Sequence, residues 1–254
     1  MQRFFTNEEF EIQQKNKKLL LPEGIFHHAI NVLRMKEGSQ FELVTKKEKV
    51  FLCEISELKK KEGYFTIQDE LMQSVELPVK VTIVCGVSKG DKAEEIVKKG
   101  TQLGADQFIF FNSKYSVARW NEKKVNKKIT RLQTIAKNAA EQSHRTHIPK
   151  VSWQTSIKNI GELAQNYQSK IVAYEESAKK GEKAALSQEF DNLKKNLDGQ
   201  MIALFGPEGG IDLTEIDELR QYGFKTVGLG PRILRAETAP LYLLAALSFA
   251  FELE

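Results

Sequence analysis

The pattern of hydrophobic and polar positions changes near Pro78, and the chain after this residue alternates buried-type strands with amphipathic helices. VKVTIVCGV (79–87) and QFIFF (107–111) are nearly continuous apolar runs. Between them, apolar or small residues recur at helical spacing, namely Ala93, Ile96, Val97, Gly100 and Leu103. Further strand-like runs are KIVAYEE (170–176), MIALF (201–205) and TVGLG (226–230). This alternation predicts an α/β fold with a parallel sheet and helices on both faces.

The first 72 residues have a different pattern, in which short apolar runs are broken by turn residues. The β-forming runs are QFELV (40–44), VFLCEI (50–55) and YFTI (64–67). One helix-like stretch, IFHHAINVLR (25–34), interrupts them. We therefore predict a small β-rich domain over residues 1–72 and an α/β domain over residues 73–254.

Two glycine-rich corners follow strand-like runs in the predicted α/β domain. FGPEGG (205–210) comes after MIALF, and GLGP (228–231) ends the run TVGLG. Ligands of open α/β sheets bind at the carboxyl ends of strands, so these corners, at successive strands, are expected to face one ligand and to hold a flat polar base by backbone contacts. Two tight turns without a ligand are the alternative. The chain has neither a P-loop nor a dinucleotide fingerprint, which disfavours a bound triphosphate or nicotinamide cofactor.

An apolar run, LYLLAALSFAF (241–251), follows the second corner and predicts a helix. Thr238 is placed to cap this helix, and Glu237 suits the positive end of the helix dipole. Arg232 and Arg235 do not fit that design, because cations are unfavourable at a helix N-terminus, so we expect them to face a ligand. Since the run is apolar on all sides, one face is expected to enter the core and the other to meet a second subunit.

A second concentration of basic residues lies on the helix predicted from WNEKKVNKKITRLQ (120–133) onward. Its apolar stripe is Val125, Ile129, Leu132, Ala136 and Ala139, and its basic residues are Lys123, Lys124, Lys127, Lys128 and Arg131. Arg119, Arg145 and His147 flank the helix. This surface is either a solvated helix face or a binding surface for an RNA backbone. His144 and His147 have no accompanying ligand set, so we do not expect a metal site.

Composition narrows the class of protein only slightly. The 254 residues include 38 Lys+Arg against 34 Asp+Glu, and the resulting net charge of +4 permits an anionic partner without requiring one. Cys53 and Cys85 both lie in apolar runs, which is typical of buried thiols in a reducing cytoplasm. No signal peptide or membrane-spanning run is recognisable, so we expect a soluble cytoplasmic protein.

Five segments resemble the bacterial 16S ribosomal RNA uracil N3-methyltransferases of the RsmE type, a branch of the SPOUT methyltransferases. They are HHAINVLRMKEG (27–38), SKGDK (88–92), AAEQSHR (139–145), LFGPEGG (204–210) and LGPRILRAETAP (229–240). The resemblance covers nearly the whole chain in the same order. One departure is SKYSV (113–117), where the resemblance leads us to expect an arginine close to Tyr115, so no RNA contact is assigned there.

The resemblance implies an N-terminal PUA-like β-barrel that binds RNA and a C-terminal SPOUT domain threaded into a trefoil knot. It also implies a homodimer with the C-terminal helix in its interface, and S-adenosylmethionine as the cofactor. The knotted loops of the family, which bind that cofactor, correspond here to the two corners. The expected cofactor-binding residues are Leu204, Phe205, Gly206, Pro207, Glu208, Gly209, Gly210, Leu229, Gly230, Ile233, Leu234, Arg235, Thr238 and Ala239.

The implied reaction is methylation of N3 of a specific uridine in 16S ribosomal RNA of the small ribosomal subunit. Arginine stays protonated and cannot act as the base, so Arg235 or Arg232 would stabilise negative charge on the uracil oxygens. Glu237 is the nearest candidate proton acceptor, and helix capping is its alternative role. The residues expected to bind RNA are Arg34, Arg119, Lys124, Lys128 and Arg145.

Two alternatives stay open. The chain could methylate another RNA, such as a transfer RNA or 23S ribosomal RNA. It could also be a non-catalytic RNA-binding factor in ribosome assembly that has kept the fold, although the intact glycine corners and both arginines argue against this.

Overall fold

The computed structural model describes residues 1–72, 75–174, 185–195 and 199–253, and it divides into two compact units. Unit 1 comprises Met1–Glu76 together with Ala140–His147, and unit 2 comprises Leu77–Ala139 and Ile148–Glu254. The division expected from the sequence did not group residues 140–147 with the N-terminal region.

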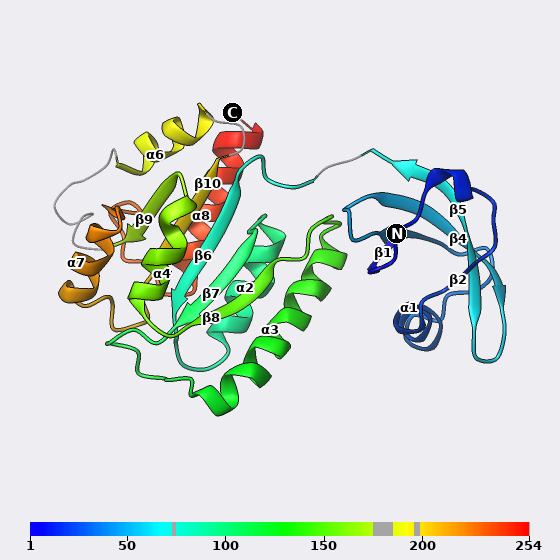
Figure 1. The fold of residues 1–254 in the computed structure, drawn as a ribbon, viewed down its shortest axis with the longest axis horizontal. Helices are drawn as coiled ribbons and strands as arrows, with labels where there is room; N and C mark the ends of the chain where they lie inside the picture. Colours follow the sequence, from blue (N-terminus) through cyan, green and yellow to red (C-terminus); the bar gives the residue numbers. More distant parts are fainter. Residues whose placement is uncertain (73–74, 175–184, 196–198, 254) are drawn as a thin grey trace. The chain divides into compact units, whose positions relative to one another are not determined.

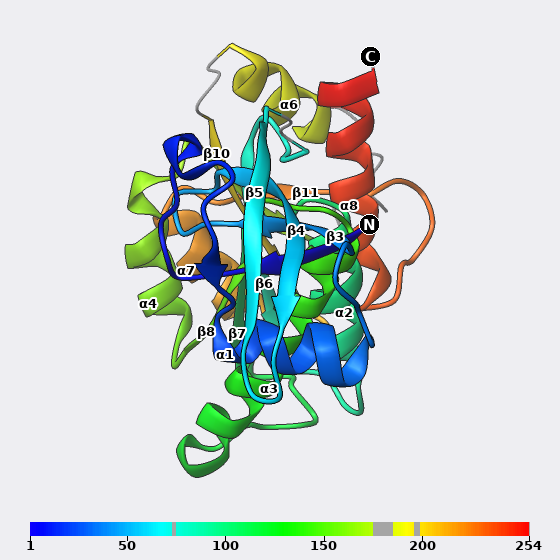
Figure 2. The same cartoon turned by 90° about the vertical axis from the view of Figure 1, so that its right-hand side faces the viewer.

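Unit 1 is built on a five-stranded sheet of order β1-β3-β4-β5-β2, of which Figure 2 labels β3, β4 and β5. Its strands are β1 (Gln2–Phe5), β2 (Leu19–Leu20), β3 (Gln40–Val44), β4 (Val50–Leu58) and β5 (Gly63–Leu71). Within the described part of this sheet, β1 pairs with β3 in parallel and the other three pairings are antiparallel. The alternation along β3 is confirmed, because Phe41 and Leu43 lie in the core with Phe51 and Phe65 from the neighbouring strands.

The helical segments of unit 1 are η1 (Ile12–Gln14), α1 (Glu23–Phe26) and η2 (His27–Val32). The stretch predicted as one helix is therefore a single α-helical turn that continues as a π-helix. Ile25 and Ala29 on this stretch are buried and pack in the core of the sheet.

A buried ion pair fixes residues 140–147 in unit 1. The guanidinium of Arg145, 3% exposed, donates from Nε to Glu76 Oε2 at 2.9 Å and forms a second short contact with the same carboxylate. The backbone N–H groups of Thr146 and His147 donate to Glu76 Oε1 at 2.8 and 3.1 Å. Burial would raise the pKa of Glu76, but Arg145 and these N–H groups outweigh it and hold the pKa below 4.5. The stability that this carboxylate contributes is thus complete above that pH and is lost as the pH falls through the lowered pKa.

A second polar cluster, centred on the buried side chain of Arg3, lies beside this pair. Arg3 Nε donates to Glu42 Oε2 at 2.7 Å, and His144 Nδ1 lies 2.8 Å from the same oxygen. Arg3 also donates to the carbonyl oxygen of Arg145 at 3.1 Å. His147 Nδ1 lies 3.0 Å from Glu48 Oε1, so each of the two histidines near this turn pairs with a glutamate of its own.

Unit 2 is built on a six-stranded sheet of order β11-β9-β10-β6-β7-β8, in which every pairing is parallel (Figure 1). Its strands are β6 (Lys80–Gly86), β7 (Gln107–Phe111), β8 (Lys150–Gln154), β9 (Ser169–Ala173), β10 (Gln200–Phe205) and β11 (Lys225–Val227). Its helices are α2 (Lys92–Gln102), α3 (Glu122–Gln142), α4 (Ile157–Leu163), η3 (Ala164–Asn166), α6 (Ala185–Lys194), α7 (Leu213–Gln221), α8 (Thr238–Ser248) and η4 (Phe249–Leu253). The predicted parallel α/β sheet is confirmed. Residues 175 and 176, expected to end the fourth strand-like run, lie outside the described residues.

Helices cover both faces of this sheet, as the two hydrophobic clusters show. One cluster joins α2, α3, α6 and α8 to one face, and the other joins α4 and α7 to the opposite face. Along β10, Ala203 and Phe205 enter the first cluster, whereas Ile202 and Leu204 enter the second. The predicted apolar stripe of α3 is confirmed, since its members lie in the first cluster or pack against it or, like Ala139, are buried. Trefoil threading of the chain stays a prediction from the resemblance.

The predicted burial of both cysteines is confirmed. Cys53 lies in the core of unit 1 and Cys85 in the core of unit 2. Burial raises the pKa of each thiol far above its ordinary value, so both side chains are neutral hydrophobic groups at physiological pH.

We expect Arg145→Met to lower the free energy of unfolding by about 3–5 kcal/mol, because it leaves the carboxylate of Glu76 buried without its cation. Urea denaturation at pH 7 measures this change. Lys60→Ala, at an exposed position between β4 and β5, is the control and is expected to change the free energy by less than about 0.5 kcal/mol. Equal stability of Arg145→Met and wild type would show that the pair does not hold residues 140–147.

Candidate active site

The carboxyl ends of three neighbouring strands bring three loops to one edge of the sheet of unit 2. β10, β6 and β7 are adjacent in the sheet, and each is parallel to its neighbour. The first corner follows β10, SKGDK (88–92) follows β6, and residues 112–120 follow β7. The second corner follows β11, which is separated from β10 by β9. The two corners thus follow successive strands of the chain, as expected, but these strands are not adjacent in the sheet.

The first corner is a rigid turn packed against the end of β6. The N–H of Gly210 donates to the carbonyl oxygen of Pro207 at 2.9 Å, and Gly210 has a φ of +78°, which glycine adopts without strain. A Cβ at Gly86 would lie 2.5 Å from Pro207 Cδ, so only glycine allows this close approach. At Gly210 a Cβ would meet no atom within 4 Å, and at Gly230 in the second corner only the hydroxyl of Tyr242 at 3.9 Å. Both corners thus leave space in which a ligand can approach the backbone.

Lys92 joins the first corner to the segment that links the second corner to α8. Its ammonium lies 2.9 Å from Glu208 Oε1 in the first corner and 3.3 Å from Glu237 Oε2, just before α8. The backbone N–H of Lys89 donates to the same oxygen of Glu208 at 3.1 Å. Because Lys92 is the first residue of α2, its charge is unfavourable to the helix dipole, and the two carboxylates offset that cost.

The ion pair between Lys92 and Glu208 stabilises the charged form of both side chains. The hydrogen bond to Glu208, and after it the contact with Glu237, raises the pKa of Lys92, so its side chain remains an ammonium at physiological pH. Partial burial would raise the pKa of Glu208, but Lys92 and backbone N–H groups outweigh burial and lower it. Glu237 Oε2 is buried and accepts no hydrogen bond, so the ion pair with Lys92 is its principal contact among the described residues.

The segment before α8 presents both predicted arginines to solvent. Arg232 and Arg235 are exposed. The carbonyl oxygen of Arg235 accepts hydrogen bonds from the N–H groups of Thr238 and Ala239 at 2.9 and 3.0 Å, which fixes the backbone of this arginine at the first turn of α8. The prediction that Thr238 caps α8 is wrong, because Glu237 occupies the cap position and Thr238 is the first helical residue. Glu237 makes no capping hydrogen bond either, since its carboxylate points to Lys92.

The residues expected to bind a cofactor fall into three groups by exposure. Those that are buried anchor the corners in the core, and those that are exposed or half-buried lie at the surface of the site. Leu204, Phe205 and Pro207 are buried; Gly206, Leu229, Leu234 and Ala239 are half-buried; Glu208, Gly209, Gly210, Gly230, Ile233, Arg235 and Thr238 are exposed.

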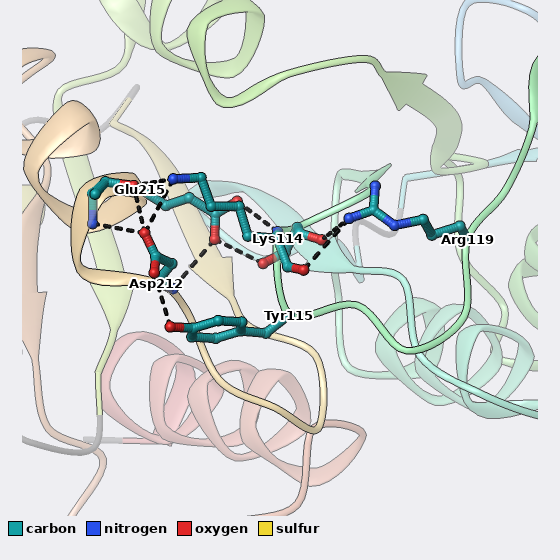
Figure 3. A network of polar contacts seen from close by, with 7 residues as sticks. Lys114, Tyr115, Arg119, Asp212 and Glu215 are labelled. Atoms are coloured by element: carbon teal, nitrogen blue, oxygen red, sulfur yellow. Dashed lines mark hydrogen bonds and ion pairs between the residues drawn. The ribbon is translucent and has the colours of Figure 1, made fainter.

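The loop after β7 is tied to the beginning of α7 by a polar network (Figure 3). Ser113 Oγ and the N–H of Lys114 donate to the two oxygens of Glu215 at 2.8 and 3.0 Å. The hydroxyl of Tyr115 donates to Asp212 Oδ2 at 2.8 Å, and the ammonium of Lys114 lies 3.2 Å from Asp212 Oδ1. Arg119 donates to the carbonyl oxygens of Ser113 and Lys114 at 3.3 and 3.4 Å, which closes the loop.

Asp212 and Glu215 also cap α7 in a reciprocal capping box. The N–H of Thr214 donates to Asp212 Oδ1 at 3.0 Å, and the N–H of Asp212 donates to Glu215 Oε2 at 3.2 Å. Hydrogen bonds from Thr214 and then Tyr115 hold the pKa of Asp212 well below its usual range. The same bond to Asp212 raises the pKa of Tyr115, so the phenol remains the donor.

Four of the five residues expected to bind RNA are exposed, and the fifth is not. Arg34, Arg119, Lys124 and Lys128 face solvent, and the ammonium of Lys128 lies 5.3 Å from the ring centroid of Trp120. Arg145 is buried against Glu76 in unit 1, so its guanidinium is engaged by the protein rather than offered to a phosphate.

The sequence reasoning missed Lys92, Glu215 and the contacts of Tyr115. Lys92 lies in SKGDK, which follows β6, and the loop with Tyr115 follows β7. The rule that pointed to the two corners, a ligand at the carboxyl ends of strands, applies equally to these two loops. This rule predicts that both loops belong to the site, but it does not predict which side chains they contact.

Two further features bear on the kind of site. No helix in the described part of the chain is long and apolar enough to cross a membrane. Among the residues that the structure describes, no group of three or more His, Cys, Asp or Glu side chains is arranged to hold a metal ion.

Comparison with known proteins gives consistent matches in both parts of the chain. Residues 75–248 match the model of an RNA methyltransferase domain, and residues 21–68 match the model of an RNA methyltransferase PUA domain. The ribosomal RNA small subunit methyltransferase E of Bacillus subtilis is 40% identical over 254 residues, which cover 100% of this chain and 98% of that protein.

Two solved structures resemble the whole chain. Ribosomal RNA small subunit methyltransferase E of Neisseria gonorrhoeae, bound to S-adenosylmethionine, is 26% identical with a TM-score of 0.82 and covers 99% of this chain and 98% of its own. A Legionella pneumophila protein with the same cofactor bound is 26% identical with a TM-score of 0.81, over 98% of this chain and 97% of its own.

We expect Glu215→Gln to lower the free energy of unfolding by about 2 kcal/mol, because the amide replaces a buried charged acceptor of three donors. Hydrogen exchange at the N–H of Lys114 is expected to accelerate in the same variant. Glu218→Gln, on the same helix, is the control. Unchanged exchange at Lys114 in Glu215→Gln would mean that this carboxylate does not hold the loop.

Proposed function

The chain belongs to the RNA methyltransferase family whose domain models match its residues 21–68 and 75–248, and from this membership we propose that it methylates RNA of the small ribosomal subunit with S-adenosylmethionine as methyl donor. The names of its relatives support the substrate, and the cofactor bound in two similar structures supports the donor. The resemblance further supports N3 of a uridine in 16S ribosomal RNA as the position methylated. Such a substrate would be met in the cytoplasm.

The residues of the two corners fit this cofactor. Gly210 and Gly230 leave room at the backbone for a ligand to approach, and Leu229, Leu234 and Ala239 offer half-buried apolar surface for an adenine ring. The carboxylates of Glu208 and Glu237 supply hydrogen-bond acceptors near both corners. When bound, the cofactor supplies an electrophilic methyl group. The part of the chain is to hold the corners together, align the uracil ring and stabilise the charge that develops on it.

Arg235 is assigned the main role in charge stabilisation. Loss of the N3 proton leaves negative charge on the uracil oxygens, and a guanidinium stabilises such charge without acting as a base. Arg235 is exposed, while its carbonyl oxygen is fixed by the first turn of α8, so its side chain starts from a rigid point. Arg232 is exposed in the same segment and is the second candidate for this role. Glu237, held by Lys92, is the carboxylate proposed to accept the proton.

A homodimer is part of the proposal. Leu243, Leu244 and Leu247 of α8 are fully buried, whereas Tyr242 is 42% and Phe249 59% exposed on the same continuous helical segment. An apolar helix face of this kind is typical of a subunit interface. A second copy of the chain is the occupant that the resemblance supports.

We expect Lys92→Met to weaken S-adenosylmethionine binding about tenfold, because the carboxylates of Glu208 and Glu237 then repel each other and the corners separate. Isothermal titration calorimetry measures the dissociation constant. Lys89→Met, which removes a nearby charge but keeps the backbone N–H that donates to Glu208, is the control and is expected to bind as wild type does. Wild-type affinity of Lys92→Met would mean that other contacts hold the corners.

We expect Arg235→Ala to lower kcat by about 100-fold or more, since it removes the cation that stabilises the uracil anion. The assay incubates the protein with methyl-labelled S-adenosylmethionine and small ribosomal subunits from cells that lack this gene. Nucleoside analysis then identifies labelled 3-methyluridine. Arg220→Ala, which removes an exposed arginine paired with Asp217 on α7, is the control.

The outcomes separate the possible roles. Undiminished turnover of Arg235→Ala with intact cofactor binding would eliminate the charge-stabilising role. If the wild-type protein binds the cofactor but labels no small-subunit RNA, the substrate is another RNA. If the wild-type protein binds no cofactor at all, a non-catalytic role in ribosome assembly is the better-supported function.

A further inference from the structure

Tyr115 is an exposed aromatic side chain that the fold holds in place at both ends. Its hydroxyl donates to Asp212 Oδ2 at 2.8 Å, yet the residue as a whole is 49% exposed (Figure 3). An aromatic residue of this size at the surface normally loses side-chain freedom only when something binds it. Here the hydrogen bond to Asp212 already restricts the side chain of Tyr115 in the folded protein. Stacking of a ligand on the ring therefore costs little further side-chain entropy.

The backbone of Tyr115 is fixed as firmly as its hydroxyl. The N–H of Ser116 donates to the carbonyl oxygen of Ser113 at 3.0 Å, and the N–H of Ser113 donates to Ser116 Oγ at 3.1 Å. Both serines are buried, so this turn is part of the core rather than a loose surface loop.

The tyrosine also contacts the first glycine corner directly. A Cβ at Gly209 would lie 2.9 Å from the carbonyl oxygen of Tyr115 and 3.0 Å from its Cβ. The absence of a side chain at Gly209 therefore lets the loop after β7 lie against the loop after β10. Tyr115 consequently lies beside the first corner, at the rim of the candidate site.

The loop that carries Tyr115 also carries two exposed basic residues. The side chain of Lys114 is 56% exposed and pairs with Asp212, and Arg119 is exposed as well. Exposed aromatic rings together with basic side chains are typical of surfaces that bind single-stranded nucleic acid, in which a base stacks on the ring and the cations attract the phosphates. The resemblance leads us to expect an arginine near this position, where this chain has Tyr115.

From these contacts we propose that Tyr115 is the stacking platform for an unpaired base of the RNA substrate at the rim of the site. Asp212 is a positioning residue that orients the ring through the phenolic hydroxyl. The inference rests on the proposed RNA methyltransferase function and adds to it the residue that receives the base. It assigns an RNA contact to residues 113–117, where the sequence alone led to no assignment.

Steady-state kinetics with unmethylated small ribosomal subunits tests the proposal. Tyr115→Ala is expected to raise KM for the subunits about tenfold or more, with kcat at saturating RNA and the dissociation constant of S-adenosylmethionine both within about twofold of wild type. Tyr115→Trp keeps a stacking face and Tyr115→Phe loses only the hydroxyl, so both are expected to stay within about threefold of the wild-type KM. Val117→Ala, which alters a 61% exposed residue of the same loop, is the control for a loop disturbance.

Each other result overturns the proposal. An unchanged KM in Tyr115→Ala would mean that no base stacks there. An equal defect in Tyr115→Phe and Tyr115→Ala would assign the effect to the bond with Asp212 rather than to the ring. Light scattering that shows a dimer in wild type and a monomer in Tyr115→Ala would make the tyrosine a subunit contact instead. Failure of the wild-type protein to methylate any RNA would contradict the proposed function itself, and the wild-type control detects that separately.

Discussion

The parallel pairing of β6 with both β10 and β7 is the constraint on which the candidate site depends. Parallel strands end at one edge, so the loops that leave these three strands must lie side by side, although they are far apart in the sequence. The glycines at this edge let the loops touch: Gly86 admits Pro207, and Gly209 admits the backbone of Tyr115. Packing of the sheet between two helical layers holds the edge fixed, so the loops need little ordering when a ligand arrives.

Ion pairs then connect what the sheet alone leaves apart. β9 separates β10 from β11, so backbone pairing does not bring the second corner to the first. Lys92 connects the first corner to the segment that follows the second, because its ammonium lies within ion-pair distance of Glu208 and of Glu237, just before α8. The network of Asp212 and Glu215 does the same for the loop after β7. In both places charged side chains pair with groups from two different segments of the chain. A few residues therefore hold several loops in position.

In the proposed function, recognition of RNA is divided between side chains on fixed backbone and exposed lysines of α3. Tyr115 and Arg235 belong to backbone that is fixed by hydrogen bonds, and both present their side chains to solvent. Lys124 and Lys128 are exposed on α3, where they supply positive charge. Rigid groups suit selection and alignment of one base, whereas exposed cations suit attraction of the phosphate backbone, which carries no sequence information.

The sequence by itself determined the periodic features. The apolar runs predicted the parallel sheet, the spacing from Val125 to Ala139 predicted the buried stripe of α3, and the glycine corners marked two loops of the site. Only the tertiary structure decided the partners of the charged residues. Arg145 was expected to meet RNA and is buried against Glu76, and Glu237 was considered as a helix cap and pairs with Lys92. Periodicity reports which side of an element is buried, because burial repeats with the backbone geometry. It does not report which distant segment ends beside a given side chain, because that depends on the strand order of the sheet.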